Sequence, residues 1–185
     1  MAARDAEIDS FDVVAGLVIE GGPQVEVLTG IAVQGGLVAA WPMLAVTALA
    51  TVDALVEHWR TWGLPAFAQF DHDTRFQGPH QHPDAVGRVI RLCLALDVVP
   101  VFAPPREMGF QAAIEGFNAQ WQANVWARFH HASLPDLQGR SARYIAAHHR
   151  RAIARIEAAP RIVQPPLGAV PVRAARRGEY VGRTP

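Results

Sequence analysis

The sequence predicts an α/β fold in which a mixed five-stranded sheet has helices on both faces. The length of 185 residues and the 50% hydrophobic content suit one domain with a packed core. The segment up to Trp41 reads as strands joined by glycine turns, which is typical of an antiparallel meander. Segments with helical spacing then alternate with short apolar strands, so the expected order is βββαβαβα with one more helix after it.

The first three strands are expected at 8–19, 24–33 and 37–41. The first is rich in β-branched residues, and the second alternates between apolar and polar residues. Glycine pairs separate the three segments and supply the tight turns of a meander. Pro42 is expected to end the third strand, since proline cannot donate a ladder hydrogen bond.

Helices and strands then alternate. Apolar residues recur every three or four positions over 47–62, which predicts a helix. A strand at 66–70 follows, then a helix that ends at Leu96 and is expected to be capped by Asp84. A short apolar run at 98–102 is the fifth strand. This order is the ribonuclease H-like arrangement.

The carboxyl-terminal part begins with a long helix over 110–129, which has one apolar stripe. A second helix is expected from 137 to 158, interrupted at 148–151 by two histidines and two arginines. Beyond it no period is clear, which favours an extended or flexible tail. The expected organisation is a ribonuclease H-like core over 1–130, a helical extension over 131–160 and a basic tail over 161–185.

The net charge of zero conceals an asymmetry. Residues 1–127 contain 6 Arg against 14 Asp and Glu, whereas residues 128–185 contain 11 Arg against 3. All 17 basic residues are arginine. An acidic body with an arginine-rich end suits a protein whose carboxylates hold metal while its other end contacts phosphate. Genomic base composition would explain the missing lysines but not the clustering.

Other features narrow the class of protein. The one cysteine, Cys93, excludes an internal disulfide, and its apolar surroundings favour a buried thiol. No apolar run reaches the roughly 20 residues that cross a bilayer. The first residues lack the apolar region of a signal peptide. We therefore expect a cytoplasmic protein with no membrane partner.

Three acidic residues are candidates for a metal site. Asp12 lies in the first strand, Asp71 ends the fourth, and Glu115 lies in the first turns of the long helix. In the expected topology these strands are neighbours and the helix crosses near them, so the carboxylates can converge. Clustered carboxylates repel one another unless a cation neutralises them. Oxygen ligands favour Mg²⁺ or Mn²⁺, and two such ions can promote phosphodiester displacement.

Three segments carry a resemblance to a known family. The segments are Asp12-Val-Val-Ala-Gly-Leu-Val-Ile-Glu-Gly-Gly, Gln69-Phe-Asp-His-Asp-Thr-Arg-Phe76 and Gly109-Phe-Gln-Ala-Ala-Ile-Glu-Gly-Phe-Asn118. They resemble the segments that present the Asp, Asp, Glu triad in DDE integrase and transposase catalytic cores, close to bacterial insertion-sequence transposases. The third is the most specific, because the glutamate stands just before a Phe-Asn pair.

The resemblance implies a bacterial, nucleoid-associated polynucleotidyl transferase. Such an enzyme joins a DNA 3′-hydroxyl to a phosphodiester, with Asp12, Asp71 and Glu115 as catalytic ligands of two Mg²⁺ or Mn²⁺ ions. Its partners would be the transposon ends and target DNA, and it would act as a homodimer or larger assembly. The residues expected to contact DNA are Arg75, Arg106, Asn118, Gln122, Arg143, Arg150 and Arg151.

The sequence also departs from the family. His72 stands where Asn is usual, and the 43 residues between Asp71 and Glu115 exceed the spacing typical of retroviral relatives. The helix-turn-helix expected before the first strand is missing, which leaves open an isolated core, a fragment or end recognition supplied elsewhere. The alternatives are a nuclease that only hydrolyses, or an inactive DNA-binding or dimerisation module. A zinc site on His72, His80 and His82 is disfavoured, since histidines in a proline-rich loop are usually exposed.

Overall fold

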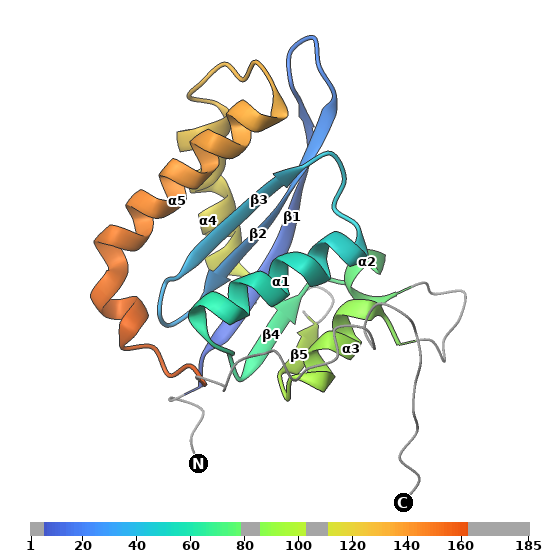
Figure 1. Cartoon of the computed structure of the whole chain (residues 1–185), viewed down its shortest axis with the longest axis vertical. Coiled ribbons are helices and arrows are strands. Elements are labelled where there is room, and N and C mark those ends of the chain that lie inside the picture. Colours follow the sequence, from blue (N-terminus) through green and yellow to red (C-terminus); the bar gives the residue numbers. More distant parts are fainter. Residues whose placement is uncertain (1–5, 79–85, 103–110, 163–185) are drawn as a thin grey trace, which may run out of the picture.

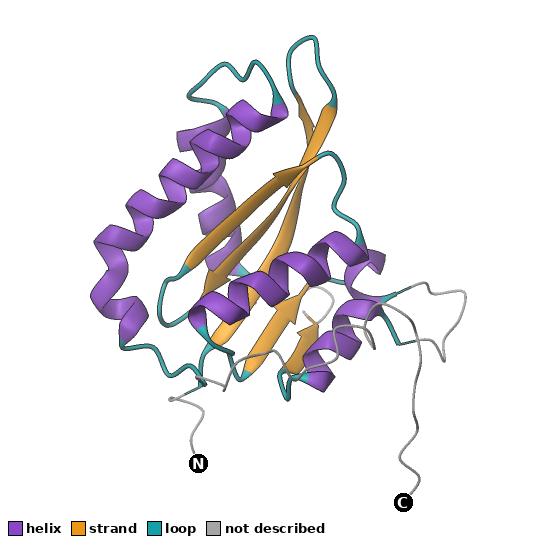
Figure 2. Ribbon diagram, in the orientation of Figure 1, coloured by secondary structure: helices purple, strands orange, loops and turns teal. Residues whose placement is uncertain are grey.

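The computed structural model is a sheet covered by helices on both faces (Figures 1 and 2). It describes residues 6–78, 86–102 and 111–162. Helices α1 and α3 cover one face of the sheet, and α4 and α5 cover the other. The predicted α/β, ribonuclease H-like layering is therefore confirmed.

The sheet has five strands in the order β3, β2, β1, β4, β5. The pairs β1 with β2 and β2 with β3 are antiparallel, whereas β1 with β4 and β4 with β5 are parallel. The first and fourth strands are therefore neighbours, as predicted. The strands are β1 (Ile8–Val18), β2 (Gln24–Ala32), β3 (Val38–Met43), β4 (Phe67–Phe70) and β5 (Val99–Phe102).

The helices follow the expected order, with the short α2 added and the helix expected over 110–129 divided into α4 and η1. None of those in the described part of the chain is both long and apolar enough to cross a bilayer. The helices are α1 (Ala48–Trp62), α2 (Thr74–Gln77), α3 (Arg88–Ala95), α4 (Ala112–Trp121), the π-helical η1 (Gln122–Trp126) and α5 (Leu134–Glu157).

Several boundaries differ from expectation for local reasons. Pro42 lies within β3, which tolerates it because β3 is an edge strand. The short helix α2 was missed; it begins where the carboxylate of Asp73 accepts a hydrogen bond from the Arg75 amide. The cap of α3 is Gly87, and Asp84 lies outside the described residues. Helix α5 runs through 148–151 without interruption, so that expectation is wrong.

Two apolar clusters hold the helices to the sheet, one on each face. On the first face, Phe11 and Phe70 stack with ring centroids 5.6 Å apart beneath α1 and α3. Cys93 is buried in this cluster, and burial raises the pKa of its thiol to about 12. On the second face, Val14 packs with Trp121 of α4. Because strand side chains alternate between faces, Asp12 lies on the α4 face, opposite Phe11.

A buried ion pair ties the segment that follows α5 to the sheet. The guanidinium of Arg161 donates to both carboxylate oxygens of Asp9 and, at 3.0 Å, to the carbonyl of Gly63. Trp59 Nε1 donates to Asp9 Oδ2 at 3.0 Å. Burial raises the pKa of Asp9, and Arg161 opposes this by stabilising the anion. The neighbouring His58 stays neutral, because burial lowers its pKa to about 3.

The ion pair corrects one expectation about the tail. Arg161 belongs to the segment 161–185, which was expected to be extended or flexible from its first residue. Instead, Arg161 is buried and Ile162 forms an antiparallel bridge with Leu64. Residues 163–185 lie outside the described part of the chain.

We expect Arg161→Leu to lower the free energy of unfolding by roughly 3 to 5 kcal/mol, because it leaves the Asp9 carboxylate buried without its cation. Urea unfolding at pH 7 measures the change. The control is Arg150→Leu, which alters an exposed arginine of α5 and should stay within about 0.5 kcal/mol. Equal effects of the two substitutions would contradict the stabilising role of the ion pair.

Candidate metal and nucleic-acid site

The pairing of β1 with β4 brings Asp12 and Asp71 together. The parallel register pairs Ile8 with Phe67 and Ser10 with Gln69. Extended by two residues, the same register sets Asp12 beside Asp71, just beyond the last residue of β4. Neighbouring strands are about 4.8 Å apart, and residues two apart in a strand share a face. Both aspartates therefore lie on the α4 face of the sheet, and we call them the carboxylate pair.

The electrostatics agree with this placement. Asp71 is half-buried, and burial raises the pKa of its carboxyl above the ordinary aspartate value. The charges of Asp12 and Asp73 raise the pKa further, whereas the Asp73 backbone amide and Arg75 lower it. A carboxylate that is held ionised next to another carboxylate is destabilised unless a cation compensates. The carboxylate pair therefore has the charge and the donor atoms of a cation site.

Asn118 holds Asp12 in position from α4. Its side-chain amide donates to Asp12 Oδ2 at 2.7 Å, and the backbone amide of Val13 donates to Asp12 Oδ1 at 2.7 Å. Asn118 is 8% exposed, so it does not lie open to DNA as the sequence had suggested. Its position four residues after Ile114 and one after Phe117, on the buried side of α4, was the signal for this role.

The second atom of the same amide supports a cation site. Asn118 Oδ1 is buried and has no hydrogen-bond partner among the described residues. An unpartnered buried carbonyl oxygen costs roughly 1 to 3 kcal/mol, which a ligand can offset. The two carboxylates supply the hard oxygen donors that Mg²⁺ and Mn²⁺ prefer, and the amide that holds Asp12 keeps an unsatisfied oxygen. The residues present therefore fit such an ion.

Glu115 stands one helical turn before Asn118, in the first turn of α4. Its side chain is exposed, and it does not form a metal-binding group with Asp12 and Asp71. Within residues 6–78, 86–102 and 111–162, no three His, Cys, Asp or Glu side chains form a group that could hold a metal ion. The structure thus assembles two of the three predicted carboxylates and places the third nearby on the flanking helix.

Asp73, the acid nearest to Asp71 in sequence, is occupied elsewhere. Its carboxylate caps α2 and pairs with Arg75, which also donates to Glu26 Oε1 at 3.0 Å. These bonds to Arg75 hold the pKa of Asp73 below its usual range. Arg75, expected to contact DNA, therefore has two carboxylate partners in the folded chain.

The remaining predicted contacts are spread over the α4 and α5 side of the molecule. Gln122 is the first residue of η1, and Arg143, Arg150 and Arg151 are exposed on α5. Arg106 and the histidines of the disfavoured zinc site, His80 and His82, lie outside the described residues. No acidic partner is found for the three α5 arginines in the part of the chain that the structure describes.

Comparison with solved structures identifies the fold as that of retroviral integrase catalytic cores. The catalytic core domain of BIV integrase matches with a TM-score of 0.58 and 13% identity, over 76% of this chain and 81% of that one. A chain of the simian T-cell lymphotropic virus intasome, solved in complex with PP2A regulatory subunit B56 gamma, matches with a TM-score of 0.59 and 12% identity. That match covers 74% of this chain and 47%, about half, of the intasome chain. No family model and no curated protein matches the sequence.

We expect Asp71→Asn to stabilise the fold at pH 7 in the absence of divalent cations. The folded-state pKa of Asp71 is raised, so its ionised form destabilises the fold above that pKa and the effect disappears well below pH 3.8. Thermal unfolding between pH 3 and pH 7 measures the dependence.

Asp73→Asn is the matched control, because the pKa of Asp73 is lowered and its ionised form stabilises the fold. This substitution should therefore lower the melting temperature at pH 7. A change of the same sign for both variants would contradict the assigned electrostatics.

Proposed function

We propose that the chain is the catalytic core of a DNA integrase or transposase, a metal-dependent polynucleotidyl transferase. The observation that carries the proposal is the carboxylate pair on adjacent parallel strands of an integrase-like sheet. Asp12, Asp71 and Glu115 would hold two Mg²⁺ or Mn²⁺ ions. Such ions supply charge neutralisation for the attacking and leaving oxygens of a phosphodiester displacement.

The residues of the chain have separate parts in this proposal. Asp12 and Asp71 would bind the metal ions, and Asn118 orients Asp12 through its 2.7 Å hydrogen bond. Glu115, exposed at the start of α4, would complete the ligand set from the helix when DNA and metal are bound. A DNA 3′-hydroxyl oxygen forms a bond to the target phosphorus, and the bond from phosphorus to the target 3′-oxygen breaks. No covalent link to the protein is required.

DNA and further copies of the chain are the proposed partners. One of the similar chains belongs to an assembly described as an intasome. Two DNA ends must be processed together in strand transfer, so we propose a homodimer or larger assembly that engages transposon ends and target DNA.

One observation favours a second candidate, an inactive DNA-binding or dimerisation module of the same fold. Glu115 does not meet the carboxylate pair in the described structure, and no complete group of three metal-binding side chains is found there. A nuclease that only hydrolyses is separated from a strand-transfer enzyme by its products, because only the latter joins a supplied 3′-hydroxyl end to target DNA.

We expect Asp71→Asn to reduce strand transfer more than about 100-fold, because it replaces an anionic ligand with a neutral one and a direct ligand matters more than the residues that orient it. Asn118→Ala should reduce it roughly 10- to 100-fold, as is typical of residues that orient a ligand. The assay follows joining of a labelled oligonucleotide to plasmid DNA with Mg²⁺ or Mn²⁺.

The control is Asp97→Asn, which changes an exposed aspartate just before the first residue of β5, at the edge of the sheet opposite to Asp71. Its φ of 55° is one that asparagine accepts. It should leave transfer unchanged. Full transfer by Asp71→Asn would refute the mechanism, and shortened but unjoined products from the unaltered chain would favour the nuclease.

A further inference from the structure

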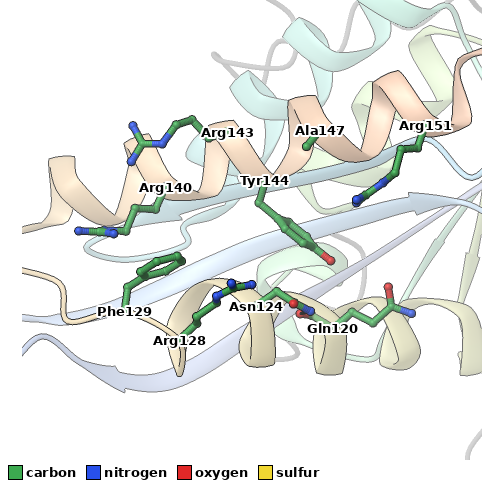
Figure 3. Close-up of a pocket in the computed structure, with 9 residues that line it drawn as sticks. All are labelled: Gln120, Asn124, Arg128, Phe129, Arg140, Arg143, Tyr144, Ala147 and Arg151. Carbon is green, nitrogen blue, oxygen red and sulfur yellow. Dashed lines mark hydrogen bonds between the residues drawn. The ribbon is translucent and has the colours of Figure 1, made fainter.

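A pocket of about 600 Å³ lies between α4 and η1 on one side and α5 on the other (Figure 3). It is separate from the carboxylate pair. Asn118 turns toward Asp12 on the sheet, whereas Gln120 and Asn124 line this pocket from another side of the same helical segment. We call it the arginine pocket. Its lining includes Arg128, Arg140, Arg143, Arg151, Phe129 and Tyr144.

The charge of the arginine pocket is one-sided. Four arginines line it, and no acidic side chain is among its described lining residues. Arg143 and Arg151 are exposed, and neither has a carboxylate partner in the described ranges. Unpaired guanidinium groups gathered around a depression create a positive potential that attracts anions. The pocket therefore has the electrostatics of a polyanion site.

Two of its arginines are held in position by their neighbours. The guanidinium carbon of Arg140 lies 4.6 Å from the ring centroid of Phe129, and that of Arg128 lies 5.7 Å from it. Arg140 Nε also donates to both oxygens of Asp136, at 3.1 and 3.2 Å. These contacts use the ring face and one N–H, so the other N–H groups remain available. Guanidinium groups fixed in this way lose little freedom on binding phosphate.

Neutral donors complete the lining. The Tyr144 side chain extends from α5 toward α4 and η1, and the amide of Gln120 lies across from it (Figure 3). Burial raises the pKa of Tyr144, so its hydroxyl keeps its proton at neutral pH. Asn124 Nδ2 is bonded to the Gln120 carbonyl at 2.8 Å. Hydroxyl and amide groups of this kind are common phosphate contacts beside arginine.

The spacing of the arginines indicates the size of the anion. Arg140 and Arg151 are eleven residues apart on α5, which is roughly 16 Å along a helix axis. One DNA strand carries a phosphate about every 3.4 Å of helix axis, so this distance spans several consecutive phosphates. A single inorganic phosphate or a nucleotide would leave one end of the row without a partner.

We propose that the arginine pocket binds the phosphodiester backbone of a DNA strand, at a surface distinct from the carboxylate pair. This inference rests on the proposed function in that the ligand is DNA, and it assigns Arg143 and Arg151 as backbone contacts. Arg150, which the sequence grouped with them, does not line the pocket. The pocket would fix the register of DNA on the protein without reading its sequence.

The test measures duplex DNA affinity of the full chain by fluorescence anisotropy over a range of salt concentrations, with Arg143→Gln/Arg151→Gln as the variant. Each lost phosphate contact lowers the slope of log affinity against log salt by about 0.9, so the double variant should lose about 1.8. The control is Arg60→Gln/Arg88→Gln, which removes the same charge from α1 and α3 on the other face of the sheet. Its slope should match that of the unaltered chain.

An unchanged slope in the pocket variant would overturn the proposal. So would tight binding of a nucleoside triphosphate that the pocket variant abolishes while its DNA affinity stays intact, since the pocket would then serve a small ligand. Strand transfer assayed in parallel separates this inference from the proposed function. If Asp71→Asn loses strand transfer while the pocket variant keeps an unchanged salt slope, the DNA-binding role of the arginine pocket is refuted and the proposed activity stands. A reduced slope without any strand transfer by the unaltered chain supports the pocket and refutes the activity.

Discussion

The parallel pairing of β1 with β4 is the constraint on which both the buried ion pair of Asp9 and the carboxylate pair depend. Near the start of β1, it places Asp9 over the core beneath α1, where Trp59 and Arg161 bind its carboxylate. Three residues further along, the same register sets Asp12 beside Asp71 on the opposite face. A shift by one residue would exchange these faces and leave both acids in the wrong surroundings. One strand therefore carries an aspartate that stabilises the fold and another that the fold tolerates.

The two aspartates of β1 show why the distinction matters. Asp9 is neutralised within the chain by a buried arginine, so its charge requires no external partner. Asp12 receives hydrogen bonds from Val13 and Asn118, no cationic side chain of the described residues pairs with it, and its charge raises the pKa of Asp71. Structural acids are normally paired, whereas an uncompensated cluster is typical of a functional site. Arg143 and Arg151 show the converse on α5, as exposed cations with no carboxylate partner among the residues that the structure describes.

The order of strands and helices could be predicted from the sequence because periodicity and glycine turns are local signals. Asp12 and Asp71 could be chosen because strand ends converge in a predictable topology. The side-chain position of Glu115 could not be predicted, since it depends on how α4 is oriented against the sheet. The contact of Asn118 with Asp12 could not be predicted either, because it joins residues far apart in the sequence and also depends on the orientation of α4. The ion pair of Arg161 with Asp9 joins residues from opposite ends of the described chain, so no local sequence pattern predicts it.

Calorimetric titration with Mn²⁺ shows whether the carboxylate pair is the cation site that we propose. We expect the unaltered chain and Asp97→Asn to bind Mn²⁺ alike, and we expect Asp12→Asn and Asp71→Asn each to lose this binding while remaining folded. Mn²⁺ binding by Asp71→Asn that equals binding by the unaltered chain would contradict the proposal.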